Sequence, residues 1–418
     1  MSTHRLDEPV LEPGVRFPHF FNGRMLSGED LTHERAANFT RQRHLAGALG
    51  SGIAHGFEIS WDTALHPDRA APVLTIAPGL ALSASGHTLR MEHPIDLAVV
   101  EPPSTAPAST GNLDFTDCET LPASVYLTGA GVYLLTVGPA DRKEGSAPVS
   151  GLGNGLAPCN AKYIAEGVRF SLLPLDVTAG STPDRARNEI AYQCFGVTAA
   201  GLVSDLANPR GPGYAPANPL AALVPRDLLT GCEVPLAVVQ WTSSGLGFVD
   251  MWAARRRLTQ PYAGGHWGGL LADRDAARNE AMFFQFQDHL ASIQAEESDL
   301  PSVEARRFFQ YLPSLGFLPL APSGRTDGFD RNRFFQGNTV RDPLHVEGAK
   351  LRHFLQLGRD FPPIDLSSPQ MIWRYLVREN VQATATPPLL LFGSGQLPYL
   401  AVPQFDVSAW NYSNYVVS

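Results

Sequence analysis

The feature that most restricts the fold of this chain is an aromatic, glycine-containing arm, residues 16–31, that runs directly into a capped helix. Phe17, Phe20 and Phe21 are too apolar to remain in water, while Pro18 and Gly23 disfavour a regular helix. We therefore expect the arm to bury its rings against the body of the chain or against a neighbouring subunit.

A helix over residues 28–49 is predicted to follow the arm. Ser27 can cap it, with Asp30 three residues later in the capping-box position, and Gly50 allows it to end. The spacing of its apolar residues predicts one buried side, made by Leu31, Phe39, Ala46 and Leu49.

Length and composition indicate a globular protein of two or three domains. The chain has 418 residues, of which 44% are apolar and 17% charged. The pattern along the chain predicts an α+β fold. Its parts are an N-terminal arm and helix (1–65), a β-rich domain that is barrel-like or sandwich-like (66–262) and an α+β C-terminal domain (263–418).

The middle region shows mostly strand signals separated by long loops rich in Pro, Gly and Ala. A small meander is expected from segments 73–77, 80–83 and 88–91, and further strands are expected at 125–127, 132–137, 168–173, 234–241 and 248–249. Three long loops, 101–123, 139–160 and 205–230, exceed what a compact domain normally contains, so we expect contacts with other subunits to order some of them.

The C-terminal region is predicted to be largely helical. Phe283, Phe286, Leu290 and Ile293 recur at helical spacing within 273–296. A second helix is expected from about Pro301 to Pro313 and a third over 347–357. Residues 371–377 fit a strand or a helix, and the tail, with Trp410, Tyr412 and Tyr415, suits a terminal strand or a contact surface.

Charge and cysteine content bear on the partners and the compartment. With 32 basic and 41 acidic residues the net charge is −9, which argues against broad nucleic-acid binding. No apolar run approaches the roughly 20 residues needed to cross a bilayer, and the first residues lack the apolar core of a signal peptide, so we expect a cytoplasmic protein as synthesised. The four widely spaced cysteines, Cys118, Cys159, Cys194 and Cys232, are expected to be isolated thiols.

The sequence contains no complete motif for catalysis or cofactor binding. Ser394 lacks the flanking glycines of a nucleophile elbow, and Gly129 precedes a strand instead of following one as a dinucleotide loop requires. His87 and His93 have no third ligand at recognisable metal spacing. We predict no catalytic residue, no metal and no cofactor, and we expect Asp250 to form a structural ion pair with Arg255 or Arg256.

Six short blocks resemble poorly characterised bacterial proteins associated with phage-tail-like contractile injection systems: residues 20–31, 56–59, 74–82 with Gly86, 234–238, 250–256 and 311–319. They are islands of turn and core residues, so they support a common fold better than a common activity. The resemblance implies a baseplate or tail-associated structural subunit, and it transfers no catalytic residue.

The leading hypothesis is a non-enzymatic structural subunit of such a particle, assembling with other subunits through its arm and ordered loops. The residues predicted to bind these partners are Phe17, Phe20, Phe21, Asn22 and Arg24. One alternative is a module whose exposed Trp and Tyr side chains bind a carbohydrate or an envelope polymer. The other is a particle-associated hydrolase, which would show convergent carboxylates in a deep cleft.

Overall fold

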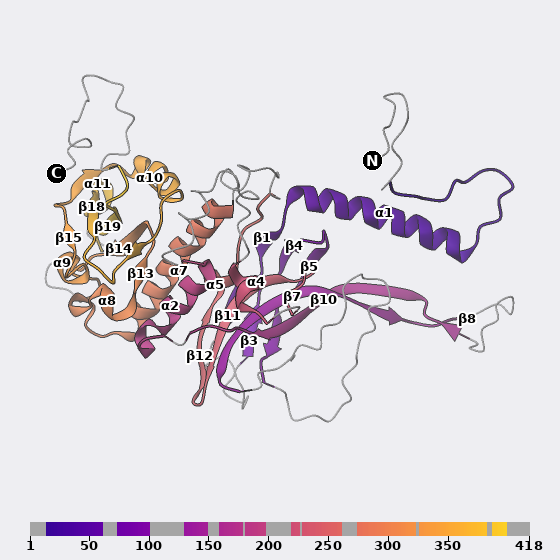
Figure 1. Ribbon diagram of the computed structural model, residues 1–418, viewed down its shortest axis with the longest axis horizontal. Coiled ribbons are helices and arrows are strands. Elements are labelled where there is room, and N and C mark those ends of the chain that lie inside the picture. The colour runs from indigo at the N-terminus through magenta and orange to yellow at the C-terminus, as the bar shows by residue number, and fades with distance from the viewer. Residues whose placement is uncertain are drawn as a thin grey trace, which may run out of the picture.

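The computed structural model describes residues 14–61, 73–100, 129–148, 159–178, 180–197, 219–225, 228–260, 274–322, 326–382 and 387–398. These residues combine helices with mainly antiparallel sheets, which confirms the predicted α+β class. The β-rich middle lies between the long helix α1 and a mixed C-terminal region (Figure 1).

Helix α1 (Gly28–Leu49) has the predicted bounds and the predicted cap. The Ser27 hydroxyl accepts a hydrogen bond from the Asp30 amide, and the Asp30 carboxylate accepts one from the Ser27 amide, both at 3.1 Å. The predicted buried side is only partly correct. Ala46 is buried and Phe39 half-buried, whereas Leu31 and Leu49 point outward.

The centre of the molecule is a four-stranded antiparallel sheet in the order β10-β7-β11-β12. Its strands are β7 (Gly131–Glu144), β10 (Tyr163–Pro174), β11 (Val234–Thr242) and β12 (Gly245–Asp250). Side chains alternate across β7: Tyr133, Leu135 and Val137 enter the core on one face, and Leu134 enters the core on the other. Because both faces of β7 are buried here, the sequence of its first half is almost continuously apolar and does not alternate with polar residues.

Two small sheets cover the first face. One has the order β1-β4-β5 and the other the order β2-β3-β6. Their strands are β1 (Gly52–Gly56), β2 (Ile59–Trp61), β3 (Val73–Ile76), β4 (Gly79–Leu82), β5 (Thr88–Met91) and β6 (Ile95–Ala98). The three predicted segments do form strands, but the expectation of one meander is wrong, because β3 and β4 pair in different sheets.

Helices cover the second face. They are α2 (Pro183–Phe195), α4 (Pro219–Leu223), α5 (Met251–Ala254) and the first half of α7 (Arg274–Glu296). Helix α2 was not predicted, although Pro183 at its first position and Gly196 at its C-cap are ordinary helix boundary signals. Helix α4 lies inside the segment predicted as the loop 205–230.

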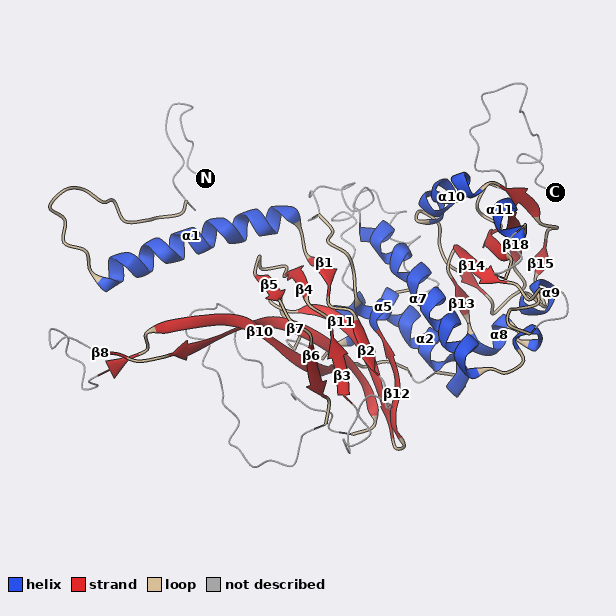
Figure 2. Ribbon diagram, turned by 180° about the vertical axis from the view of Figure 1, so that it is seen from behind, coloured by secondary structure: helices blue, strands red, loops and turns tan. Residues whose placement is uncertain are grey.

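Strands β7 and β10 continue past the sheet as a two-stranded ribbon, which Figure 2 shows projecting beneath α1. Their pairing runs from Tyr133 opposite Pro174 to Glu144 opposite Tyr163. Two short strands follow toward its tip, β8 (Ala147–Pro148) and β9 (Cys159–Asn160). The prediction of a loop from residue 139 is therefore wrong for 139–144, where the charged residues Asp141, Arg142, Lys143 and Glu144 conceal the strand pattern.

The C-terminal region is built on a sheet in the order β14-β19-β18-β15, with β16 also paired to β18. Residues 371–377 are strand β18, which settles the ambiguity of the sequence. The predicted helix from Pro301 to Pro313 is wrong, because three short elements replace it. The elements of this region are η1 (Leu300–Ser302), α8 (Ala305–Phe308), β13 (Tyr311–Leu312), β14 (Leu315–Pro319), α9 (Arg331–Phe334), β15 (Thr339–Val340), β16 (Leu344–Val346), η2 (Gly348–Lys350), α10 (Leu351–Gly358), β17 (Ile364–Asp365), β18 (Met371–Val377), α11 (Arg378–Val381) and β19 (Leu389–Ser394).

The cysteine prediction needs one correction. Cys194 is a free, buried thiol, but Cys232 is disulfide-bonded and so is not an isolated thiol. The predicted strand at 125–127, the loop 101–123, Cys118 and the aromatic tail lie outside the described residues.

Candidate interaction surface

The arm extends past the N-terminal end of α1 (Figure 1). Its aromatic rings are exposed to solvent. Phe17, Phe20 and Phe21 are 57%, 47% and 60% exposed, and the following residues Met25 and Leu26 are exposed as well. Five exposed apolar side chains within ten residues indicate an interaction site more strongly than single exposed residues scattered over a surface do.

Polar contacts within the chain hold the arm in this shape. Arg24 donates from Nη1 to the His19 carbonyl at 2.6 Å and forms an ion pair with Asp30. Gly23 adopts a φ of +89°, which allows the turn that brings the Arg24 amide to the Phe21 carbonyl. The hydrogen bonds from Ser27, together with the charge of Arg24, lower the pKa of Asp30, so it stays charged.

The five predicted partner-binding residues thus divide into two groups. The three phenylalanines and Asn22 are exposed to solvent. Arg24 is half-buried and bonds within the chain, so its observed contacts hold the arm in position. Arg41 of α1 also contacts the arm, with its guanidinium carbon 4.5 Å from the centre of the Phe17 ring.

Polar contacts between described residues fix helix α1 to the body in both of its halves. Near its C-terminal end, Arg43 donates from Nε to the Ser85 carbonyl at 3.1 Å, in the turn between β4 and β5. In its first half, Arg35 pairs with Glu166 of β10 at 2.8 Å. The helix and its arm therefore extend along the ribbon as a defined projection.

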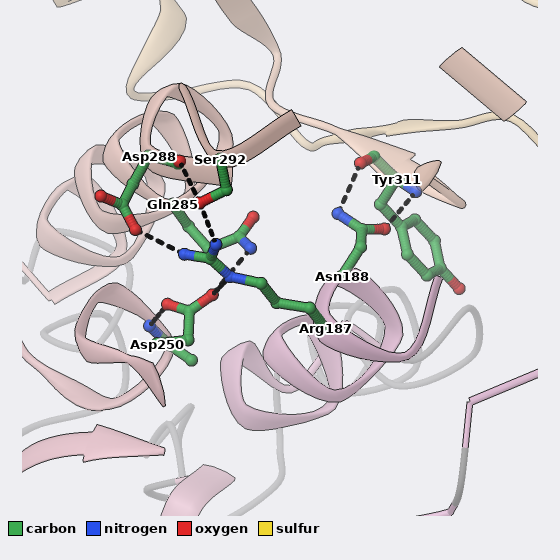
Figure 3. Close-up of polar contacts among 8 residues, drawn as sticks. Arg187, Asn188, Asp250, Gln285, Asp288, Ser292 and Tyr311 are labelled. Carbon is green, nitrogen blue, oxygen red and sulfur yellow. Dashed lines mark hydrogen bonds and ion pairs between the residues drawn. The ribbon is translucent and has the colours of Figure 1, made fainter. Parts of the chain in front are cut away.

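A buried polar cluster, absent from the sequence predictions, joins the sheet helices to the C-terminal region (Figure 3). Arg187 of α2 donates to Asp250 at 2.8 Å, to Ser292 at 3.0 Å and to Asp288. Asp250 also accepts from Gln285 at 2.9 Å and caps α5 through the Ala253 amide. The expected pairing of Asp250 with Arg255 or Arg256 is therefore wrong, because Arg255 pairs with Glu58 and Arg256 bonds to carbonyls of α5.

A second contact of α2 continues this junction. The Asn188 side chain donates to the Tyr311 carbonyl and accepts from the Gln310 and Tyr311 amides, all at 3.0 Å. Tyr192, one turn further along α2, stacks on Tyr311 with ring centres 4.9 Å apart. Asn188 thus satisfies backbone groups of Gln310 and of β13 much as a neighbouring strand would.

The ionisable groups beside the cluster are held neutral. Burial and the charge of Arg187 lower the pKa of His289 to about 3, outweighing the opposite effect of Asp250. Burial raises the pKa of Cys194 to about 12. At neutral pH the imidazole is therefore uncharged and the thiol protonated, and a protonated thiol is a poor nucleophile.

A cavity of about 340 Å³ lies beside Cys194, between α2, α4, β11 and α7. Four charged groups line it. Glu233 accepts from the Thr230 amide at 3.0 Å, Arg256 donates to the Trp252 carbonyl at 2.8 Å, and Asp275 pairs with Arg278 at 3.3 Å. All four groups thus have partners within the chain. Within the described ranges, no three His, Cys, Asp or Glu side chains are grouped so that they could hold a metal ion.

Comparison with known proteins assigns the chain to no group: no family model matches it, and no curated protein does. In the part of the chain that the structure describes, no helix combines the length and apolarity required to cross a bilayer.

Proposed function

We propose that the protein is a non-enzymatic structural subunit of a phage-tail-like contractile injection particle, located in the baseplate or in another tail-associated position. The observation that carries the proposal is the arm, which exposes three phenylalanine rings although Arg24 and Asp30 fix its backbone. Aromatic anchors presented in a fixed geometry are what stable subunit interfaces use.

The other projecting elements support the same role. The β7–β10 ribbon extends beyond the central sheet, and α1 runs along it (Figure 2). The two therefore give the molecule an elongated end with a large surface relative to its volume. A particle component that contacts several neighbours needs such extended surfaces, and the sequence blocks that resemble injection-system proteins add to this argument.

The test is capture of the tagged, full-length protein from its native host, with mass spectrometry of its companions. Sheath, tube or spike proteins among them are the expected result. Replacing Phe17, Phe20 and Phe21 together by Ser should remove these companions, because the apolar anchors are lost while the cap and the Arg24 contacts remain.

A matched control replaces two other exposed apolar residues, Met371 and Val381, by Ser and should keep the companions. Wild-type protein that captures no particle component would contradict the particle assignment. Capture that survives the triple replacement would contradict the role of the arm.

The second candidate function is binding of a carbohydrate or an envelope polymer. Its supporting observation is the exposure of two aromatic side chains of the β-rich region, Trp61 and Tyr163, which can stack on sugar rings. Binding on a glycan array that is lost in Trp61→Ala or Tyr163→Ala protein would favour it over the particle assignment.

A further inference from the structure

Helix α1 exposes larger apolar side chains than it buries. Leu31, Leu45 and Leu49 are 57%, 69% and 65% exposed, whereas its buried residues are the small side chains Ala37 and Ala46. A helix that packs only against its own body shows the opposite arrangement. The outer face is therefore built for a partner.

Three polar residues lie between the leucines on this face. Asn38 donates to Glu34 Oε1 at 3.1 Å and accepts from Arg41 Nη1 at 3.2 Å. The second carboxylate oxygen of Glu34, Oε2, is shielded from solvent and has no hydrogen-bond partner among the described residues. The face thus presents a negative and a positive group on either side of a central amide.

The order of these residues is self-complementary about Asn38. Leu31 and Leu45 lie seven residues before and after it, which is about two helical turns in each direction. Glu34 and Arg41 lie four before and three after, about one turn in each direction. An antiparallel second copy, turned about a two-fold axis at Asn38, therefore places Leu31 opposite its Leu45 and Glu34 opposite its Arg41.

We propose that α1 is a homodimer interface in which two copies pair antiparallel through this outer face. Each contact occurs twice, as a two-fold axis requires. The pairing gives two leucine contacts and two Glu34–Arg41 ion pairs, and Leu26 of each copy approaches Leu49 of the other. Antiparallel packing also brings the positive N-terminal end of each helix dipole toward the negative C-terminal end of the other.

This inference does not depend on the particle assignment, because it concerns a different partner. The outer face of α1 would contact a second copy of the same chain, and it adjoins the arm at Arg41, whose guanidinium carbon lies 4.5 Å from the centre of the Phe17 ring. An interface of one helix pair is small, so we expect a reversible, concentration-dependent dimer.

The test is sedimentation velocity on the full-length protein over a concentration series. Wild-type protein should show a monomer–dimer equilibrium. Glu34→Arg and Arg41→Glu should each weaken it at least about tenfold, because two attractive ion pairs become two repulsive ones. The decisive sample is the equimolar mixture of the two variants, in which every Arg faces a Glu again, and which should regain the wild-type affinity as a heterodimer.

A matched pair of variants controls for general charge effects. Arg142 and Glu144 form an exposed ion pair within β7, so Arg142→Glu and Glu144→Arg should leave the dimer unchanged. Circular dichroism should show the same helix content in all variants, because Arg41 is exposed and Glu34 belongs to none of the hydrophobic cores.

Cysteine cross-linking tests the register independently. Asn38→Cys should form an intermolecular disulfide under mild oxidation, because the two-fold axis brings residue 38 of both copies together. Leu45→Cys alone should not cross-link, whereas the double variant with Leu31→Cys should. A protein that is monomeric at all concentrations, a dimer indifferent to Glu34→Arg and Arg41→Glu, or a mixture that stays dissociated would each overturn the proposal.

Discussion

Arg187 and Asp250 form a buried ion pair across the junction between α2 and the start of α5, with Nε of Arg187 2.8 Å from Oδ2 of Asp250. Burial alone would lower the pKa of Arg187, but the charges of Asp250 and Asp288 outweigh it and raise the value. The guanidinium therefore remains charged, with Ser292 as an additional acceptor from the C-terminal half of α7.

Replacing Asp250 by Ala should destabilise the protein by about 3–5 kcal/mol, because a buried guanidinium loses its main partner and α5 loses its cap. Urea denaturation of the two proteins measures the difference. The matched control is Glu166→Ala, which breaks the exposed pair with Arg35 and should cost about 0–1 kcal/mol. Similar losses in the two variants would contradict the structural importance of the buried cluster.

The low pKa of His289 makes folding stability depend on pH. The folded protein keeps this imidazole neutral down to about pH 3, whereas the unfolded chain protonates it near its ordinary pKa of 6.5. Below pH 6.5 the unfolded state therefore binds more protons than the folded state. The free energy of unfolding falls by up to about 1.4 kcal/mol for each unit by which the pH is lowered. The free energy of unfolding, measured by urea denaturation between pH 7 and pH 5, should fall less steeply in His289→Gln protein, and an unchanged slope would contradict this account.

Two glycines, Gly47 within α1 and Gly86 in the turn that contacts it, should respond in opposite directions to replacement by alanine. Gly86 has a φ of +82°, and a Cβ there would lie 2.5 Å from the Arg43 carbonyl oxygen. Gly86→Ala should therefore destabilise the protein by more than about 1 kcal/mol and weaken the attachment of α1 to the turn. Gly47, inside α1, has open space where an added methyl group would lie, so Gly47→Ala should stabilise it by about 0.5–1 kcal/mol. Thermal unfolding of both variants checks the signs, and an equal effect in both would contradict the contact between α1 and the turn.

The cap of α1 predicts a local effect. Ser27→Ala removes the hydroxyl that accepts from the Asp30 amide, and should cost about 1 kcal/mol of helix stability. Hydrogen exchange of the amides of the first turn should become faster by about tenfold or less, while the amides of the central sheet keep their rates. Unchanged exchange in the first turn would show that the arm, and not the cap, fixes the start of the helix.

Locally encoded features of the fold could be read from the sequence. The bounds of α1 follow from Ser27, Asp30 and Gly50, and α7 follows from the spacing of Phe286, Leu290 and Ile293. The outer half of strand β7 could not be read in this way, because four charged residues, 141–144, follow one another there without apolar alternation. The buried face of α1 could not be read from the sequence either. Leu31 and Leu49 have the spacing of a buried face, but the body of the molecule covers a different face of the helix.

The candidate surface was only partly predictable for a similar reason. The apolar character of the arm is a property of neighbouring residues, so Phe17, Phe20 and Phe21 stood out at once. The buried cluster joins Arg187 to Asp250, 63 residues away in the chain, and to Asp288, 101 residues away. Such a pairing has no periodic signature, and α2, which carries Arg187, was itself missed.

Helix α7 contributes to two hydrophobic cores, with Met282 in the core beneath the central sheet and Phe286 in the core of the C-terminal region. One turn of a single helix thus links the two halves, so neither can lose its packing without disturbing the other. A fragment that ends before Arg274 would expose to solvent the apolar residues against which Met282 packs. The two halves, produced separately, should therefore aggregate.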